Sequence, residues 1–249
     1  MLKSNNLEIS MIKHVFEHNG GLQSLHFVSP NKQEIAPLIV LFPAFDGHAE
    51  FIITYAHRLV DQGFQVVIAD MYGKGAKFDN LEQCFKHVTP LVNDRKLVRE
   101  LTVKNIKAAA SHTDFALDEI GVMGFCIGGM CTLEAARAGL DIEAYFCAHG
   151  NLTKDENLET LCQPSANIML AQGYSDPLVG ANQIEAFATE MASVNWSCMF
   201  YGNTEHSFTD HNVGAMDQAK EAELGRKYNP YAAEQCFQQA VMFFENHLC

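Results

Sequence analysis

The sequence carries little positive charge. It has 17 Lys and Arg residues against 30 Asp and Glu residues among 249, which gives a formal net charge of −13. A chain of this charge is poorly suited to bind nucleic acid or an anionic membrane surface, and no segment forms a basic stripe that would offset it. We therefore expect neither nucleic acid nor a membrane as a partner.

Long apolar runs and linker-like segments are also missing. No run approaches the roughly 20 apolar residues that span a bilayer, and the first 20 residues lack the apolar core and cleavage site of a secretory signal. No repeat, low-complexity tract or Gly/Ser/Pro-rich linker divides the chain. We expect a single domain over residues 1–249, which is long enough to bury a large core.

The eight cysteines lack the spacing of a metal site or of a disulfide framework. No CxxC pair or Cys/His spacing fits zinc, so we expect neither a metal nor a cofactor. Several cysteines lie inside apolar segments such as 144–147, which favours buried free thiols. Free thiols are typical of a reducing compartment, and the expected location is the cytoplasm.

Short β-branched runs alternate with helix-length segments from about residue 38. The pattern predicts strands at 38–42, 64–69, 120–125, 144–148, 168–172 and 196–201. Helices are expected to follow at about 51–62, 92–110, 127–138, 182–192 and 231–247. The segments 9–16 and 22–28 are expected to form a hairpin at the sheet edge. This alternation is typical of an α/β fold with a mostly parallel central sheet and helices on both faces, with ligands at the carboxyl ends of the strands.

Between one such strand and helix lies Gly124-Phe125-Cys126-Ile127-Gly128-Gly129, which has the form of a G-x-S-x-G nucleophile elbow with Cys at its centre. In such a turn a strained backbone lifts the central side chain above the sheet, and glycines are needed two positions away on either side. The helix that follows lowers the pKa of the thiol, and the Ile127 amide points at a developing oxyanion. We interpret Cys126 as a nucleophile and Cys131, farther along the helix, as a packed structural thiol.

A nucleophile of this kind needs a base and an orienting acid, in the chain order nucleophile, acid, histidine. Asp176 follows the end of the predicted strand 168–172 within Gly173-Tyr174-Ser175-Asp176-Pro177. His206 follows the next predicted strand after a turn-rich segment. The order predicts a triad of Cys126, Asp176 and His206.

With these residues assembled, the chain resembles the dienelactone hydrolase family of α/β-hydrolases from Leu38 to Leu248. The most specific matches are the Cys-centred elbow, the Gly173…Asp176-Pro177 loop, Glu205-His206-Ser207-Phe208 and the run Ala69 to Gly75. The resemblance implies an α/β-hydrolase fold, the triad above, and an oxyanion hole from the backbone amides of Ile127 and Phe45. The side chains expected to line the substrate site are Tyr72, Arg95, Phe125, His149 and Phe208.

Two positions depart from the family pattern. Ala44 occupies the position of a glutamate that helps to control the ionisation of the family's cysteine, and Asp210 occupies that of an arginine that holds a substrate carboxylate. The resemblance therefore implies a cysteine-dependent hydrolase of a small-molecule carboxylic ester or lactone, without implying the namesake substrate.

Two other functions remain open from the sequence. The loss of the glutamate at Ala44 is compatible with a non-catalytic α/β-hydrolase-fold binding protein. A low-pKa thiol at Cys126 is also compatible with a redox sensor, which would need a resolving cysteine.

Overall fold

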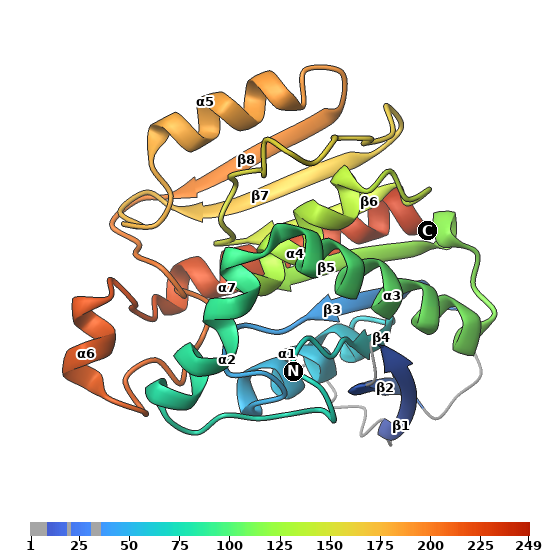
Figure 1. The fold of residues 1–249 in the computed structure, drawn as a ribbon, viewed down its shortest axis with the longest axis horizontal. Coiled ribbons are helices and arrows are strands. Elements are labelled where there is room, and N and C mark those ends of the chain that lie inside the picture. The colour runs from blue at the N-terminus through green and yellow to red at the C-terminus, as the bar shows by residue number, and fades with distance from the viewer. Residues whose placement is uncertain (1–8, 19–20, 31–35) are drawn as a thin grey trace, which may run out of the picture.

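The computed structural model describes residues 9–18, 21–30 and 36–249 (Figure 1). The expectation about a leader sequence rests partly on residues outside these ranges. The strands are β1 Ile9–His18, β2 Gly21–Pro30, β3 Leu38–Phe42, β4 Gln65–Ile68, β5 Ile120–Phe125, β6 Ala144–Ala148, β7 Asn167–Gly173 and β8 Asn195–Tyr201. The α-helices are α1 Glu50–Asp61, α2 Leu81–Asn93, α3 Arg95–Thr113, α4 Ile127–Arg137, α5 Ala181–Glu190, α6 Gln218–Glu223 and α7 Pro230–Leu248.

All eight strands form one sheet in the order β1-β2-β4-β3-β5-β6-β7-β8. Strands β3 to β8 pair in parallel with one another, which confirms the predicted mostly parallel sheet. The predicted hairpin is confirmed as β1 and β2, which pair antiparallel, and β2 pairs antiparallel with β4. The central strands β3, β5 and β6 are fully buried, because helices cover both of their faces.

Helices pack on both faces of the sheet (Figure 1). On one face α1 and α7 are joined by an ion pair between Arg58 and Glu234 at 2.7 Å. On the other face α4 is joined to α5 by the buried pair of Arg137 and Glu190 at 2.9 Å, and α3 packs on α4. This layering is the arrangement that right-handed βαβ crossovers impose.

The helix predicted over 92–110 is wrong in its extent. The chain forms two helices here, because Asp94 leaves the helical conformation, with φ of −131° and ψ of 86°, and its side chain accepts from Leu97 N as the N-cap of α3. Helix α2 precedes this break and begins at its own N-cap, Asn80. Neither α2 as a separate helix nor the short α6 was predicted.

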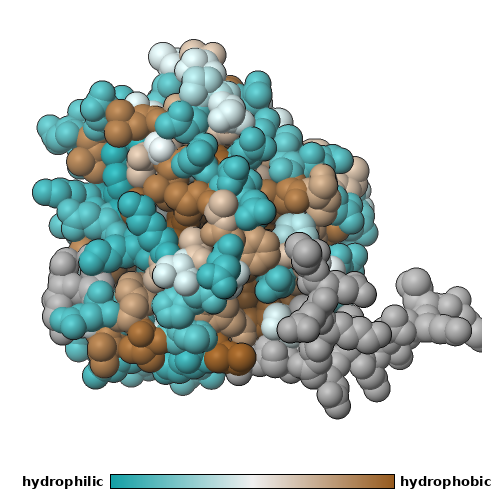
Figure 2. Space-filling model, turned by 90° about the vertical axis from the view of Figure 1, so that its right-hand side faces the viewer, coloured by the Kyte–Doolittle hydropathy of each residue, from teal (hydrophilic) through white to brown (hydrophobic). Residues whose placement is uncertain are grey.

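The carboxyl ends of the parallel strands lie toward the left of Figure 1, and the loops that follow β3, β5, β6, β7 and β8 gather there. Figure 2 shows the opposite side of the molecule, where hydrophilic side chains surround a central group of apolar residues. Within the described ranges no helix has the length and apolar character needed to cross a membrane. Ligands of parallel α/β sheets bind where the carboxyl ends of the strands meet. We therefore expect the ligand site at the edge where the loops after these strands gather.

Candidate active site

Cys126 lies on the turn between β5 and α4, with φ of 55° and ψ of −115°. A non-glycine residue in such a conformation costs on the order of 1–3 kcal/mol. The surrounding structure holds it there: its backbone N–H donates to Ala148 O at 3.1 Å and to His149 Nδ1 at 3.2 Å. The strained elbow predicted from the sequence is therefore present in the fold.

The glycines on either side of Cys126 allow three backbone segments to come together. A Cβ on Gly124 would overlap the carbonyl group of Gly128, and a Cβ on Gly128 would overlap the carbonyl oxygens of Phe42 and Pro43 at the end of β3. Because both clashes are with backbone atoms, no side-chain movement would relieve them. The close approach puts the start of α4 against β3.

His206 and Asp176 lie beside the thiol. His206 Nε2 is 3.1 Å from Cys126 Sγ, and His206 Nδ1 is 2.8 Å from Asp176 Oδ2. Asp176 is fixed in its turn, since its Oδ1 also accepts from Leu178 N at 2.8 Å. All three side chains come from loops or turns at the carboxyl ends of strands, and both His206 and Asp176 are buried. The structure thus brings together the three residues that the sequence pattern selected.

The electrostatics of the pair favour separated charges. Burial alone would raise the pKa of Cys126, but the nearby charge and hydrogen bond of His206 lower it, with smaller contributions from Arg226 and the Ile127 amide. Burial alone would lower the pKa of His206, but the thiolate and the hydrogen bond that Nδ1–H donates to Asp176 raise it to about 9. A thiolate hydrogen-bonded to an imidazolium is the resting state that these shifts support.

His149 contacts the backbone of the elbow, and its hydrogen bonds fix one neutral tautomer of the imidazole. Its Nδ1 must be unprotonated, because a backbone N–H can only donate to it, and its Nε2–H then donates to Thr209 Oγ1 at 2.8 Å. Burial and the neighbouring His206 lower the pKa of His149 well below the usual value, which keeps the ring uncharged. The ring packs edge to face against His206 with centroids 5.2 Å apart. His149 therefore supports the turn that carries Cys126.

The thiol opens into a largely apolar cavity of about 300 Å³. Cys126 and His206 contribute the paired groups, and Asn151 and Arg226 are its other polar residues. The remaining lining residues are Phe45, Phe85, Val88, Val92, Ile127, Met130, Leu178 and Leu224. Phe45 and Ile127 thus line the same cavity as the thiol, and among the described residues none accepts a hydrogen bond from the Phe45 amide.

Arg226 is a site residue that the sequence did not identify. A parallel bridge between residues 206 and 226, with His206 N bonded to Gly225 O at 2.9 Å, brings it next to His206. Its guanidinium stacks 4.2 Å from the centre of the Phe45 ring. No local motif surrounds Arg226, so only the tertiary pairing could reveal it.

The charge of Arg226 is balanced within the protein. Glu221 Oε2 lies 2.8 Å from its Nη1 and Asp210 Oδ2 lies 3.5 Å from its Nη2. Asp210, which stands where the family carries an arginine, thus faces a cation that the chain supplies from elsewhere. The cavity wall has no unpaired positive charge among its described residues.

The five side chains expected to line the substrate site lie outside this cavity lining. The Tyr72 hydroxyl donates to Ala44 O at 3.4 Å. Phe125, Phe208 and His149 are buried, and His149 accepts from the Cys126 backbone N–H. Arg95 is buried behind Asn151, to which its Nη2 donates at 3.3 Å. These residues lie near the site, but the cavity wall is made by residues of α2, α4 and the loops.

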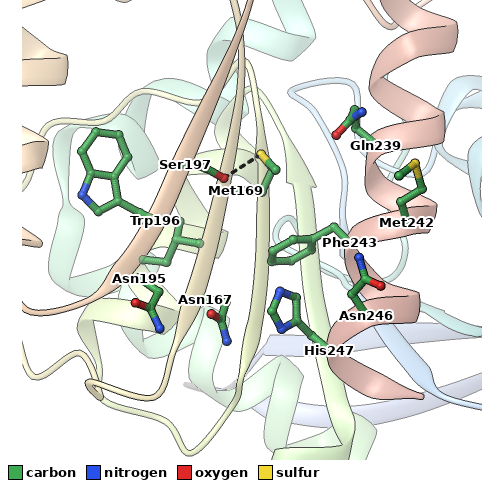
Figure 3. A pocket seen from close by; sticks show the side chains of 11 residues that line it. Asn167, Met169, Asn195, Trp196, Ser197, Gln239, Met242, Phe243, Asn246 and His247 are labelled. Atoms are coloured by element: carbon green, nitrogen blue, oxygen red, sulfur yellow. Dashed lines mark hydrogen bonds between the residues drawn. The ribbon is translucent and has the colours of Figure 1, made fainter.

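A second cavity of about 320 Å³ lies between β7, β8 and the end of α7 (Figure 3). Its labelled side chains are mainly amides and thioethers, and Ser197 Oγ contacts Met169 Sδ at 3.2 Å. It opens beside Asn167 and Asn195, at the amino ends of β7 and β8, away from Cys126. Its lining contains no cysteine and no carboxylate beside His247. The described residues also contain no group of three or more His, Cys, Asp or Glu arranged to hold a metal ion.

Comparison with known proteins agrees with this architecture. A chain described as a probable 2-oxo-3-(5-oxofuran-2-ylidene)propanoate lactonase from Bradyrhizobium sp. is 23% identical over 242 residues, 93% of this chain and 92% of that one. The crystal structure of a dienelactone hydrolase-like promiscuous phosphotriesterase from metagenomic libraries superposes with a TM-score of 0.87. It is 24% identical and covers 96% of this chain and 98% of its own. A dienelactone hydrolase from Anabaena variabilis superposes with a TM-score of 0.65 at 16% identity, over 97% of this chain and 100% of its own.

These neighbours share the α/β-hydrolase fold expected from the sequence. The sequence profile of the dienelactone hydrolase family matches residues 24–248, from within β2 to the end of α7. The matched range contains every residue of the site described above. The chain belongs to the dienelactone hydrolase family.

Proposed function

We propose that the protein hydrolyses small, uncharged carboxylic esters or lactones with Cys126 as nucleophile, His206 as base and Asp176 as orienting acid. The observation that carries the proposal is the chain of contacts from Asp176 through His206 to Cys126 at the wall of an apolar cavity. Family membership independently supports hydrolysis of lactones or esters.

In the proposed reaction the Cys126 thiolate attacks the carbonyl carbon, and an S–C bond forms as the C=O π electrons move to oxygen. The amides of Ile127 and Phe45 would stabilise this oxyanion. The C–O bond then breaks, and the leaving alkoxide takes the proton from His206 Nε2. In the second half, neutral His206 takes a proton from water and becomes the imidazolium, and the hydroxide oxygen forms a C–O bond with the thioester carbonyl carbon. The C–S bond then breaks, which releases the acid and leaves Cys126 as the thiolate.

The charge distribution of the cavity supports an uncharged substrate. The Arg226 guanidinium is balanced by Glu221 and Asp210, the His206 imidazolium is paired with Asp176 and the thiolate, and most of the lining is apolar. A carboxylate entering this space would lose hydration without gaining an unpaired cation. This distinguishes the proposal from the Bradyrhizobium relative, whose name specifies a propanoate.

The test is a screen of aryl esters, lactones and thioesters, each with and without a carboxylate, against the wild type, Cys126→Ala and Cys126→Ser. We expect hydrolysis of uncharged members by the wild type and its loss in Cys126→Ala. Undiminished activity in Cys126→Ala would refute the nucleophile, and a preference for carboxylated members would refute the uncharged substrate class.

The two other functions predict different results. A binding protein would release no product from any activated ester and leave Cys126 no more reactive than free cysteine. A redox sensor would need a resolving thiol, but Cys131 is fully buried and burial raises its pKa to about 12. These features favour the hydrolase.

A further inference from the structure

Asn151 lines the cavity that contains Cys126. It follows β6 by three residues, at the carboxyl edge of the sheet. Its side chain is the one neutral amide among the polar lining residues, and neither the proposed reaction nor the family resemblance uses it. It is therefore free to act on the substrate.

The orientation of this amide is fixed by its neighbours. Asn151 Oδ1 accepts from Arg95 Nη2 at 3.3 Å, from Thr153 N at 2.9 Å and from Thr153 Oγ1 at 2.6 Å. A guanidinium and a backbone N–H can only donate, so the atom that they contact must be the oxygen. The amide nitrogen Nδ2 is consequently on the other side of the group.

No residue in the described part of the chain accepts a hydrogen bond from Asn151 Nδ2. The nitrogen is not among the buried polar atoms that lack a partner, so it is exposed to solvent, and it belongs to a residue that lines the cavity. Donation by the Arg95 guanidinium to Oδ1 polarises the amide and strengthens its N–H groups as donors. The result is an oriented, accessible donor in a wall that is otherwise mostly apolar.

We propose that Asn151 is a specificity-determining residue, which donates a hydrogen bond from Nδ2 to a neutral oxygen, an ether or a carbonyl, on the substrate. This inference rests on the proposed ester or lactone hydrolysis and narrows its substrate class. Arg95 acts as a positioning residue through Oδ1. A neutral acceptor fits better than a carboxylate, because the amide offers no charge and Arg226 is already paired.

The experiment compares isosteric ester pairs. In the acyl series, 4-nitrophenyl esters carry an ether oxygen in place of one CH₂ at successive chain positions, beginning with methoxyacetate against butyrate. In the alcohol series, a 4-methoxyphenyl ester is compared with its 4-ethylphenyl counterpart. For each pair the ratio of kcat/KM values is measured in wild type, Asn151→Ala and Asn151→Asp. Intrinsic ester reactivity cancels when these ratios are compared between enzymes.

For at least one oxygen position we expect both substitutions to lower the oxygen-to-methylene ratio by about 3- to 10-fold, the range for one hydrogen bond. Asn151→Asp tests the donor most directly, because it keeps the shape and the contact with Arg95 and removes the N–H groups. Asn157→Ala is the matched control, since Asn157 is exposed in the same loop region and outside the cavity. It should leave every ratio unchanged.

The outcomes separate this inference from the proposed function. If wild type hydrolyses the esters in a Cys126-dependent way and the Asn151 variants leave all ratios unchanged, the role of Asn151 is refuted and the hydrolase stands. If wild type hydrolyses no ester, both proposals are refuted. A general fold defect in a variant would lower the kcat/KM values of both esters in a pair together. Thermal unfolding of each variant identifies such a defect.

Discussion

Cys126 and His206 form a residue pair whose charge state depends on pH. Neighbouring charge lowers the pKa of Cys126 against the opposing effect of burial, and the pKa of His206 is raised to about 9. At pH values between the pKa of Cys126 and that of His206, the thiolate and the imidazolium coexist. Above about pH 9 the imidazolium loses its proton, and below the pKa of Cys126 the thiolate gains one.

We predict that alkylation of Cys126 by iodoacetamide keeps its rate as the pH falls from 9 toward neutrality. An ordinary thiol with a pKa of about 8.5 loses reactive thiolate over that interval. In His206→Gln the largest contribution that opposes burial is lost, so the pKa of Cys126 rises and the rate at pH 7 should fall by about tenfold or more. Mass spectrometry of the peptide that contains Cys126 gives the rate without interference from the exposed Cys249. Wild-type alkylation that follows the pH profile of free cysteine would contradict the ion pair.

At this scale the sequence predicted the residues that sit in a recognisable local context. Cys126 has flanking glycines, and Asp176 and His206 each follow a strand. Their order along the chain was therefore sufficient to predict that the three side chains lie together. Arg226 follows no strand, and Asn151, although it follows β6, lies in no catalytic motif. The bridge to His206 brings Arg226 to the cavity, and one hydrogen bond from Arg95 helps to orient Asn151 there. Both are tertiary contacts that residue spacing does not encode.

The elbow is the element on which the site depends. A Cβ on Gly124 would overlap the backbone of Gly128, so β5 and α4 could not keep their spacing. We predict that Gly124→Ala lowers the free energy of unfolding by about 3 kcal/mol, the upper part of the usual range for overpacking, and slows Cys126 alkylation. Urea denaturation and alkylation rates measure the two effects.

Gly202→Ala provides the matched control for the elbow. Gly202 lies after β8, and a Cβ there would meet nothing within 4 Å. Its substitution should change the free energy of unfolding by less than about 0.5 kcal/mol. Equal effects of the two substitutions would show that the overlap at Gly124 is relieved by movements of the chain.

Element boundaries were predicted where the residue pattern changes sharply. The buried strands 38–42, 120–125 and 144–148 coincide with β3, β5 and β6. The predicted helix over 92–110 continued through Asp94, because the apolar spacing gives little sign of a break there. The break depends on the side chain of Asp94 bonding Leu97 N, a local competition between capping and helix continuation.

At the scale of the whole molecule, Asp46 links global stability to pH. Burial and the nearby Asp210 raise its pKa to about 7, whereas an unfolded aspartate has a pKa of about 3.9. Between these values the folded chain keeps a proton that the unfolded chain has lost. Its stabilising effect is complete below about pH 4 and disappears as the pH rises through 7.

We therefore predict that Asp46→Asn increases the free energy of unfolding relative to wild type at pH 8 more than at pH 5. Between about pH 4 and pH 7, Asp46 makes the free energy of unfolding of the wild type fall by about 1.4 kcal/mol per pH unit, to an upper limit of about 4 kcal/mol in total. The substitution removes this dependence on pH. Urea denaturation at both pH values measures it. The exposed Asp79→Asn serves as control for the change in net charge, and an identical pH dependence of the two variants would contradict the assignment.

The fixed neutral ring of His149 has a consequence for proton traffic. Its two nitrogens are occupied by the Cys126 N–H and by Thr209, although it packs directly against His206. A proton on His206 therefore finds no relay through His149 into the protein interior. In the proposed reaction the proton on His206 leaves with the alcohol product and is replaced by one taken from water, so each turnover returns the site to its starting charge.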